Sequence, residues 1–239
     1  MCQNATMISS RPSALNSERL ASELDEHGYA TRALLDPATC RQLADLYDSD
    51  DTFRKRIVME RHGYGRGEYK YFAYPLPDVV AQLREAIYPA LAAVANGWRR
   101  ALGMDETFPD TLAAYLARCH EAGQTRPTPL LLRYGADGFN CLHQDLYGEH
   151  VFPLQLTILL SQPEVDFTGG EFVLVEQRPR AQSRAEVVPL RQGEAVIFPV
   201  RERPAKGARG YHRVTMRHGV SRLRSGNRHT LGIIFHDAA

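Results

Sequence analysis

The second half of the chain is made of short β-prone stretches that are separated by turn signals. Short strands at close spacing are typical of a β-barrel or a β-sandwich. Turn-forming groups at 135–138, 168–170 and 225–227 separate several of these stretches. We therefore predict eight strands, at 129–135, 140–146, 152–161, 171–177, 185–190, 194–200, 212–220 and 229–236.

The first half of the chain has a helical pattern instead. Ser17 is a suitable N-cap for a first helix, and Asp36-Pro37 begins a second one, because proline is favoured in the first helical turn. Helices are predicted over 17–26, from 37 onward, over 78–102 and over 110–120.

These two patterns together predict an α+β protein built as a single domain. We expect a disordered lead-in at 1–15, a helical N-terminal region at 16–126 that supports the rest, and a β-rich core at 127–239. With 239 residues, the chain is long enough to bury a sizeable core.

His143 and Asp145 lie two residues apart in the second predicted strand. Because alternate side chains of a strand leave the same face, this imidazole and this carboxylate point into one space. His218, in the seventh predicted strand, can complete a set of two histidines and one carboxylate. That set leaves open positions on a bound metal and is typical of non-haem Fe(II) sites. We therefore predict a metal centre at His143, Asp145 and His218.

Each part of this prediction has an alternative. A histidine and an aspartate two residues apart also occur by chance on strand surfaces. His212 is a rival to His218, because both lie in the seventh predicted strand and, six residues apart, can share a face. Two histidines and one carboxylate also suit catalytic zinc.

Basic side chains are concentrated towards the C-terminus. Residues 176–228 carry 13 Lys and Arg against 4 acidic side chains, although the whole chain has a formal charge of only +1. This stretch suggests an anionic partner, either a phosphate backbone or a small dicarboxylate; the alternative is an ordinary solvated surface.

Residues 61–74 combine aromatic and basic side chains. Aromatic rings stack on nucleobases and neighbouring cations bind phosphates, so this segment is a candidate substrate lid. The competing interpretation is a strand that packs on the β-rich core. The candidate lid residues are Tyr69, Tyr71, Phe72 and Tyr74.

The remaining features indicate a cellular compartment. The four cysteines form no CxxC pair, and we interpret them as free thiols of a reducing compartment. The N-terminal segment lacks an apolar signal core, and no run approaches the roughly 18 apolar residues of a membrane span. We expect a cytoplasmic protein with no membrane partner and leave its oligomeric state open.

The β-rich core resembles the double-stranded β-helix of the Fe(II)- and 2-oxoglutarate-dependent dioxygenases. In that family a His-x-Asp lies on the second core strand, a distal histidine on the seventh, and a basic residue at the eighth binds the tail carboxylate of 2-oxoglutarate. His143, Asp145, His218 and Arg228 match in order and spacing, and 218–228 resembles the prolyl-hydroxylase-like branch. The resemblance implies a jelly-roll, cupin-like core with the helical half packed against it.

A narrower similarity is to the AlkB-type dioxygenases that repair nucleic acids. Arg133-Tyr134, followed by 142–145, resembles their first two strands, in which the tyrosine helps to hold 2-oxoglutarate. The chain departs from their pattern at Leu132, where they carry an asparagine, and Arg228 lies closer to the distal histidine than their arginine does. The chain is also similar to a bacterial oxygenase family predicted to act on damaged DNA.

The resemblance implies Fe(II), 2-oxoglutarate and O2 as cofactors. Iron would be bound by the metal centre, and 2-oxoglutarate by Arg228 together with Tyr134, since a guanidinium binds a carboxylate through two parallel hydrogen bonds. We predict hydroxylation of a substrate C–H bond, with alkylated nucleic acid as the substrate, bound through the basic C-terminal half and demethylated. The alternatives are hydroxylation of a protein side chain or a small molecule, and a catalytically silent binding module.

Overall fold

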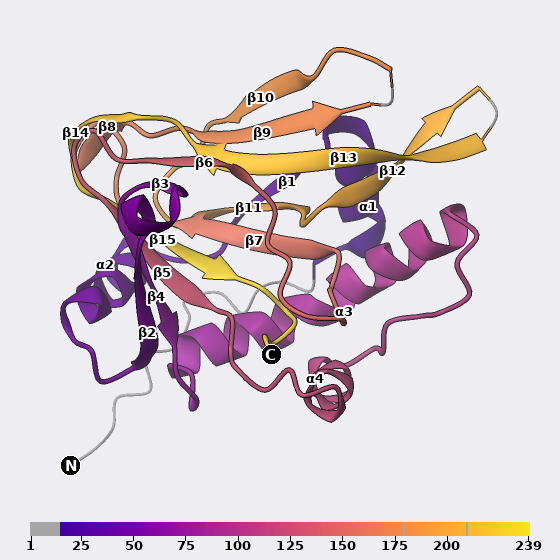
Figure 1. Cartoon of the computed structure of the whole chain (residues 1–239), viewed down its shortest axis with the longest axis horizontal. Coiled ribbons are helices and arrows are strands. Elements are labelled where there is room, and N and C mark those ends of the chain that lie inside the picture. Colours follow the sequence, from indigo (N-terminus) through magenta and orange to yellow (C-terminus); the bar gives the residue numbers. More distant parts are fainter. Residues whose placement is uncertain (1–14, 179, 209) are drawn as a thin grey trace.

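The computed structural model describes residues 15–178, 180–208 and 210–239. The predicted lead-in at 1–15 lies outside this range except for its last residue. Two antiparallel sheets face each other, and helices cover the outer face of the larger one (Figure 1). This mixture of helices and antiparallel sheets agrees with the predicted α+β class.

The larger sheet has seven strands, and every pairing within it is antiparallel. Its central strands are rich in β-branched and aliphatic residues, which suits strands buried on both faces. In spatial order its strands are β1 (Ala30–Ala33), β11 (Glu194–Pro199), β7 (Leu154–Leu159), β15 (Arg228–Ile233), β5 (Leu130–Tyr134), β4 (Glu68–Phe72) and β2 (Phe53–Val58).

The smaller sheet lies above the larger one in Figure 1. The aromatic side chains of Phe172 and Phe198 meet between the two sheets, with ring centroids 5.0 Å apart. Its strands are β10 (Arg184–Val188), β9 (Phe172–Gln177), β13 (Gly210–Val220), β6 (Phe139–His143) and β3 (Gly65–Arg66), with β12 (Glu202–Gly207) paired to β13. A separate pair is formed by β8 (Phe167–Gly169) and β14 (Leu223–Gly226).

The helices form because their apolar residues recur on one face and their first turns are capped. Asn16, not the predicted Ser17, caps the first helix by accepting a hydrogen bond from the Arg19 backbone, and Asp36 caps the second. The helices are α1 (Ser17–His27), α2 (Pro37–Asp45), α3 (Asp78–Ala101) and α4 (Leu112–Glu121), with short 3-10 turns η1 (Leu46–Asp48) and η2 (Met59–His62).

The main hydrophobic core lies between the helices and the larger sheet. Buried residues of α3 such as Ile87 and Leu91 belong to one cluster with Leu156 and Ile158 of β7. An aromatic group around Phe152 contributes Tyr88, Phe235, Phe108 and Tyr115 to the same cluster. This packing fixes the larger sheet, and with it the strands that carry functional side chains.

All eight predicted strands overlap observed ones, but five short strands within the described residues lie where no strand was considered. Three of them, β8, β12 and β14, lie in the second half, and β1 and β2 lie in the region that was expected to be mostly helical. The strands β3 and β4 lie within residues 61–74, for which a packed strand was the alternative to a lid. Strands of two to six residues with mixed polarity give little periodic signal. Both sheets therefore draw strands from either side of residue 127, and the predicted boundary there stays a prediction. Within the described residues no helix is long and apolar enough to span a membrane.

Candidate metal centre and the adjoining cavity

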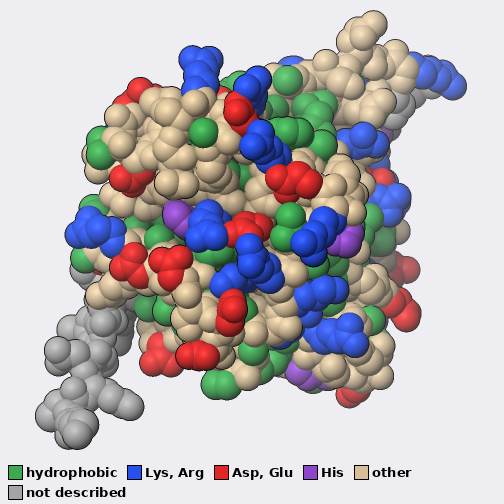
Figure 2. Space-filling model, turned by 60° about the vertical axis from the view of Figure 1, so that its left-hand side comes forward, with side chains coloured by type: hydrophobic (Ala, Val, Ile, Leu, Met, Phe, Trp, Pro, Cys, Tyr) green, Lys and Arg blue, Asp and Glu red, His purple; other side chains and the backbone are tan. Residues whose placement is uncertain are grey.

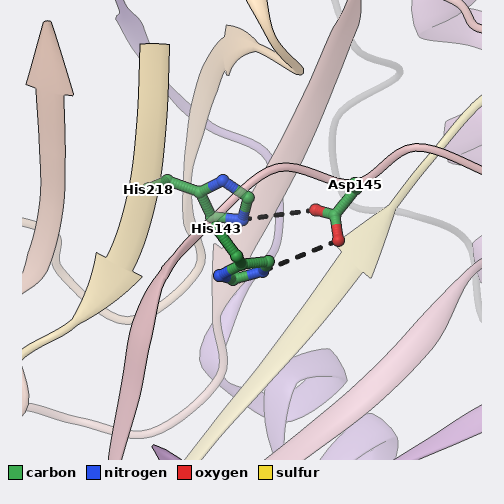
Figure 3. Close-up of side chains that lie close together, drawn as sticks. All are labelled: His143, Asp145 and His218. Carbon is green, nitrogen blue, oxygen red and sulfur yellow. Dashed lines mark ion pairs between the residues drawn. The ribbon is translucent and has the colours of Figure 1, made fainter. Parts of the chain in front are cut away.

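Three side chains of the predicted metal centre converge at one end of the space between the sheets. His143 is the last residue of β6, and His218 lies directly opposite it on β13. Nε2 of His218 lies 3.3 Å from Oδ2 of Asp145, and Nε2 of His143 lies 3.6 Å from Oδ1 (Figure 3). All three residues offer ligand atoms within 4.8 Å of one another, so this group could hold a metal ion.

A glycine permits the close approach of the two histidine-bearing strands. A Cβ atom on Gly219 would lie 2.7 Å from the carbonyl oxygen of Asn140 on β6. The ladder between the strands also shifts register between His218 and Val220. The missing side chain thus lets β13 lie against β6, with the two imidazole rings 4.2 Å apart.

Hydrogen bonds and burial set the protonation of the three ligands. Nδ1 of His143 lies 2.8 Å from the Cys141 carbonyl, which can only accept, so Nε2 carries the lone pair. Burial lowers the pKa of His218, and the neighbouring His143 imidazole lowers it further. Burial alone would raise the pKa of Asp145, but its hydrogen bond to His218 and the nearby imidazoles hold that pKa well below its ordinary value.

This donor set fits Fe(II). A metal ligand must be deprotonated, and the geometry offers an ionised carboxylate and two imidazole nitrogens from one side. Two histidines and one carboxylate are the facial triad of non-haem Fe(II) oxygenases and leave three positions of an octahedral ion open.

His212 lies far from this group. It sits in the β12–β13 hairpin opposite Ala205 and is exposed. Six residues along a strand span about 20 Å. The structure therefore brings His218, and not His212, to His143 and Asp145.

A cavity of about 420 Å³ opens beside the three ligands. This volume is within the range of small-molecule sites. Residues of both sheets line the cavity, together with Gly63 and Tyr64 and the loop that follows β6.

Arg228 is buried in the wall of this cavity, with 1% of its surface exposed. Its Nε and Nη1 atoms have no hydrogen-bond partner among the residues that the structure describes. Burial lowers the pKa of the guanidinium to about 10, although Tyr134 and Glu171 oppose that shift. A buried cation with free donors is costly unless an anion pairs with it.

Tyr134 lies beside Arg228, because the two residues are direct neighbours across β5 and β15. The guanidinium carbon lies 5.8 Å from the centre of the tyrosine ring. Burial raises the pKa of Tyr134 to about 12. Asn140 donates a hydrogen bond of 3.3 Å to the Tyr134 hydroxyl oxygen, so the phenolic proton is free to be donated elsewhere.

Only part of the candidate lid reaches the cavity. Tyr69 lines it, and Tyr71 lies behind it, bonded to Tyr147. Phe72 is fully buried in the main core, and the Tyr74 hydroxyl donates to Asp237. The structure therefore does not bring Phe72 or Tyr74 to this cavity, and their lid role stays a prediction: residues 68–72 form strand β4, whose alternate side chains leave opposite faces, and Tyr74 follows that strand.

Several residues at the cavity were missed. Tyr64, Tyr147 and Gln155 line it without having been selected. For Tyr147 the sequence carried a signal, since it follows Asp145 by the same two-residue step that separates Asp145 from His143. Tyr64 belonged to the aromatic segment, but only the turn that precedes β3 shows that it reaches the cavity.

Several basic side chains of the C-terminal half are paired with acidic ones. Arg203 is buried against Glu176, and Arg178, Arg213 and Arg222 also pair with acidic side chains. On the face that Figure 2 shows, Lys and Arg side chains are interspersed with Asp and Glu. Counting charges along the chain therefore overstated the positive charge available to a partner.

Comparisons with known proteins agree with this site. A family model described as "Oxygenase, catalysing oxidative methylation of damaged DNA" matches residues 67–238. An uncharacterised protein of Mycobacterium tuberculosis is 54% identical over 191 residues, which cover 78% of this chain and 82% of that protein.

Two solved structures share the fold. A Pseudomonas putida prolyl-4-hydroxylase has a TM-score of 0.54 at 14% identity, covering 93% of this chain and 99% of its own. An oxidoreductase of the 2OG-Fe(II) oxygenase family from Burkholderia pseudomallei has a TM-score of 0.53 at 15% identity, covering 93% of each chain.

Family and ligand set together define an oxidoreductase, an oxygenase with a candidate metal centre, and its fold is that of the two solved structures. The chain belongs to the oxygenase family whose model matches residues 67–238. The predicted oxygenase class is thereby confirmed, and the two histidines and one carboxylate fit the predicted Fe(II).

Proposed function

We propose that this oxygenase hydroxylates methyl groups on alkylated nucleic acid. His143, Asp145 and His218 would hold Fe(II), while Arg228, with Tyr134, would hold 2-oxoglutarate. When bound, the two cofactors and O2 supply the oxidant: one oxygen atom enters the substrate C–H bond, and succinate and CO2 are formed. A hydroxymethyl group on nitrogen then leaves as formaldehyde, and the demethylated base remains.

One observation carries the proposal, namely that the three metal ligands and an unpaired buried guanidinium open on the same cavity. Iron alone would not require the arginine. A dicarboxylate would bind the metal and the arginine together, because one carboxylate would reach the metal while the other would accept hydrogen bonds from Nε and Nη1 of Arg228. The free phenolic proton of Tyr134 supplies a further donor beside that carboxylate.

The two facing sheets also fit a double-stranded β-helix, which we propose as the finer fold class. The second and seventh predicted strands, observed as β6 and β13, are adjacent and carry the two histidines. The eighth, observed as β15, begins at Arg228. The two histidines thus lie on neighbouring strands of the smaller sheet, and Arg228 lies on a strand of the larger sheet.

A glycine beside Arg228 provides a test of the 2-oxoglutarate site. Gly170 has φ +64°, and a Cβ there would lie 2.5 Å from Cδ1 of Leu223 and 3.1 Å from Cδ of Arg228. We expect Gly170→Ala to weaken 2-oxoglutarate binding by displacing the guanidinium, and to lower the free energy of unfolding by about 1–3 kcal/mol.

Gly103→Ala is the matched control, because Gly103 has φ +68° and nothing within 4 Å of an added Cβ. It should show the backbone strain alone and leave the affinity for 2-oxoglutarate unchanged, as measured by isothermal titration calorimetry. Equal affinity for 2-oxoglutarate in the two variants would show that a side chain at position 170 does not displace Arg228.

An aromatic side chain at the mouth of the cavity supports a nucleobase as the substrate. Tyr64 lines the cavity with 49% of its surface exposed, and its ring stacks on His62 with centroids 5.2 Å apart. The Cys141 backbone N–H donates to the Tyr64 carbonyl at 2.8 Å, which ties this ring to β6. Exposed Leu142 and Leu146 lie on the same cavity. A fixed ring with one free face suits stacking on a base.

The test uses single-stranded oligonucleotides with and without N-methylated bases. Iron-loaded protein with 2-oxoglutarate and O2 should release formaldehyde only from the methylated strand. Stacking contributes about 1–3 kcal/mol per base, so Tyr64→Ala should raise KM roughly 5- to 150-fold.

Tyr211→Ala is the control, since Tyr211 is 47% exposed but lies in the β12–β13 hairpin, away from the cavity. It should leave KM unchanged. Succinate formation without formaldehyde from any methylated strand would reject nucleic acid and favour a protein side chain or small molecule as the substrate.

A further inference from the structure

Asp145 lies outside the sheet that positions the two histidines. Strand β6 ends at His143, so no ladder hydrogen bonds hold Asp145 in place. Residues 144–151 form an irregular loop. The aspartate therefore needs other contacts to keep its carboxylate between the two imidazoles.

Tyr147 supplies such a contact. Its hydroxyl lies 2.9 Å from Oδ1 of Asp145, which is also 3.6 Å from Nε2 of His143, whereas Oδ2 lies closer to an imidazole, 3.3 Å from Nε2 of His218. An ionised carboxylate only accepts hydrogen bonds, so the phenol is the donor. One carboxylate oxygen is thus engaged by the protein, and the other is turned towards the imidazole of His218.

Two neighbours contact Tyr147, and Gln124 is the one that holds its backbone. The Tyr71 hydroxyl donates to the Tyr147 hydroxyl at 3.1 Å, and the two rings meet edge to face. Gln124, which is 1% exposed, donates from Nε2 to the backbone carbonyls of Tyr147 and His150 and accepts from the His150 N–H through Oε1. Gln124 therefore holds the backbone of the loop that carries Asp145 and Tyr147.

We propose that Tyr147 is a positioning residue of the metal centre, which keeps Asp145 a single-oxygen ligand by occupying Oδ1. This inference rests on the proposed role of Asp145 as a metal ligand. The consequence is chemical: two imidazoles and a single carboxylate oxygen leave three positions of an octahedral ion open, whereas a carboxylate bound through both oxygens would leave two. The reaction needs three, two for 2-oxoglutarate and one for O2.

The experiment compares Tyr147→Phe with Tyr71→Phe. Tyr147→Phe removes only the hydroxyl and leaves the ring packed against Tyr71. Tyr71→Phe removes the hydroxyl that donates to Tyr147 but keeps the hydrogen bond from Tyr147 to Asp145. It is therefore the matched control. Thermal unfolding confirms that both variants are folded at the assay temperature.

Metal binding is measured without turnover, by titrating each protein with Mn(II) and following free Mn(II) by electron paramagnetic resonance. Loss of an outer hydrogen bond to a ligand typically weakens metal binding about 10- to 100-fold. We expect that loss in Tyr147→Phe, a changed spectrum of its bound Mn(II), and less than about threefold change in Tyr71→Phe. At saturating iron, succinate formation by the Tyr147→Phe enzyme should stay below that of wild type, because a carboxylate bound through both oxygens would leave only two positions open.

The possible outcomes separate the two proposals. If wild-type protein binds no Mn(II) or Fe(II), the metal centre itself is rejected. If wild type binds and Tyr147→Phe binds equally well with an unchanged spectrum, the positioning role is overturned. An equal loss in Tyr71→Phe would also overturn it, because that variant keeps the bond to Asp145.

Discussion

Replacement of Arg228 by methionine is expected to raise the dissociation constant for 2-oxoglutarate by about 30- to several-thousand-fold. Truncating one member of a buried, hydrogen-bonded charge pair costs roughly 2–5 kcal/mol, and the 2-oxoglutarate carboxylate is the proposed partner of this guanidinium. Isothermal titration calorimetry on the metal-loaded protein measures the change directly. An affinity within a few-fold of wild type would remove Arg228 from the cofactor site.

The same substitution should have the opposite effect on the ligand-free protein. Arg228 is a buried cation whose Nε and Nη1 lack partners within the described part of the chain, so an apolar side chain of similar length relieves a cost. We expect the melting temperature of Arg228→Met without 2-oxoglutarate to equal or exceed that of wild type. Addition of 2-oxoglutarate should stabilise wild type and leave the variant unchanged.

Arg203→Met is the control for this comparison. Arg203 is equally buried, but it donates to the carboxylate of Glu176 and to the backbone carbonyl of Asp25. Its removal leaves a buried carboxylate without one of its partners, which costs about 3–5 kcal/mol. The stability of the ligand-free protein should therefore fall in Arg203→Met and stay equal or rise in Arg228→Met. A large loss of stability in Arg228→Met would indicate a structural role for Arg228 instead.

A second large effect is expected at the metal centre. His218→Ala removes one of three ligands, so its affinity for Fe(II) or Mn(II) should fall by more than the 10- to 100-fold typical of losing an outer-shell contact. His212→Ala, on the same strand but exposed in the hairpin, should bind metal as wild type does. Anaerobic titration of both variants measures the difference.

The reverse pattern, with His212→Ala losing the metal and His218→Ala retaining it, would contradict the site. The positions of the two histidines in the structure argue against that result. The His218 ring packs against the rings of Phe172 and Phe198 and lies opposite His143, whereas His212 has Ala205 as its strand partner.

The metal centre could be predicted from the sequence because its ligands follow strand periodicity. The side chains of His143 and Asp145 still point into the same space, although the strand ends at His143 and Asp145 lies in a loop. Continuing that step would also have selected Tyr147. Arg228 could be placed because it begins the last core strand, but its lack of a partner is a fact of three-dimensional packing.

The lid could not be predicted from residue type alone. Aromatic and basic residues between 61 and 74 suggested a substrate lid, with a strand packed on the β-rich core as the alternative, and β4 joins the larger sheet beside β5 as that alternative expects. In that strand Tyr69 and Tyr71 share a face near the cavity, while Phe72 points to the opposite side and enters the main core. The decisive information is the pairing with a strand some sixty residues away, which local patterns do not contain.

The charge of the C-terminal half was misleading for a similar reason. Arg203 and Glu176 are far apart in the chain but meet in the smaller sheet, where they neutralise each other. Arg222 pairs with Asp137 across another turn. Nucleic acid therefore has to be argued from the aromatic rim at Tyr64 and from the family description, rather than from net charge.

The most direct test of the central claim is oxygen-dependent formation of succinate from 2-oxoglutarate by anaerobically iron-loaded protein. This assay needs no identified substrate, because it measures turnover of 2-oxoglutarate itself. We predict that wild type forms succinate, that His143→Ala forms none, and that Arg228→Met requires far more 2-oxoglutarate for the same rate. Undiminished succinate formation by His143→Ala would contradict the proposed centre at His143, Asp145 and His218.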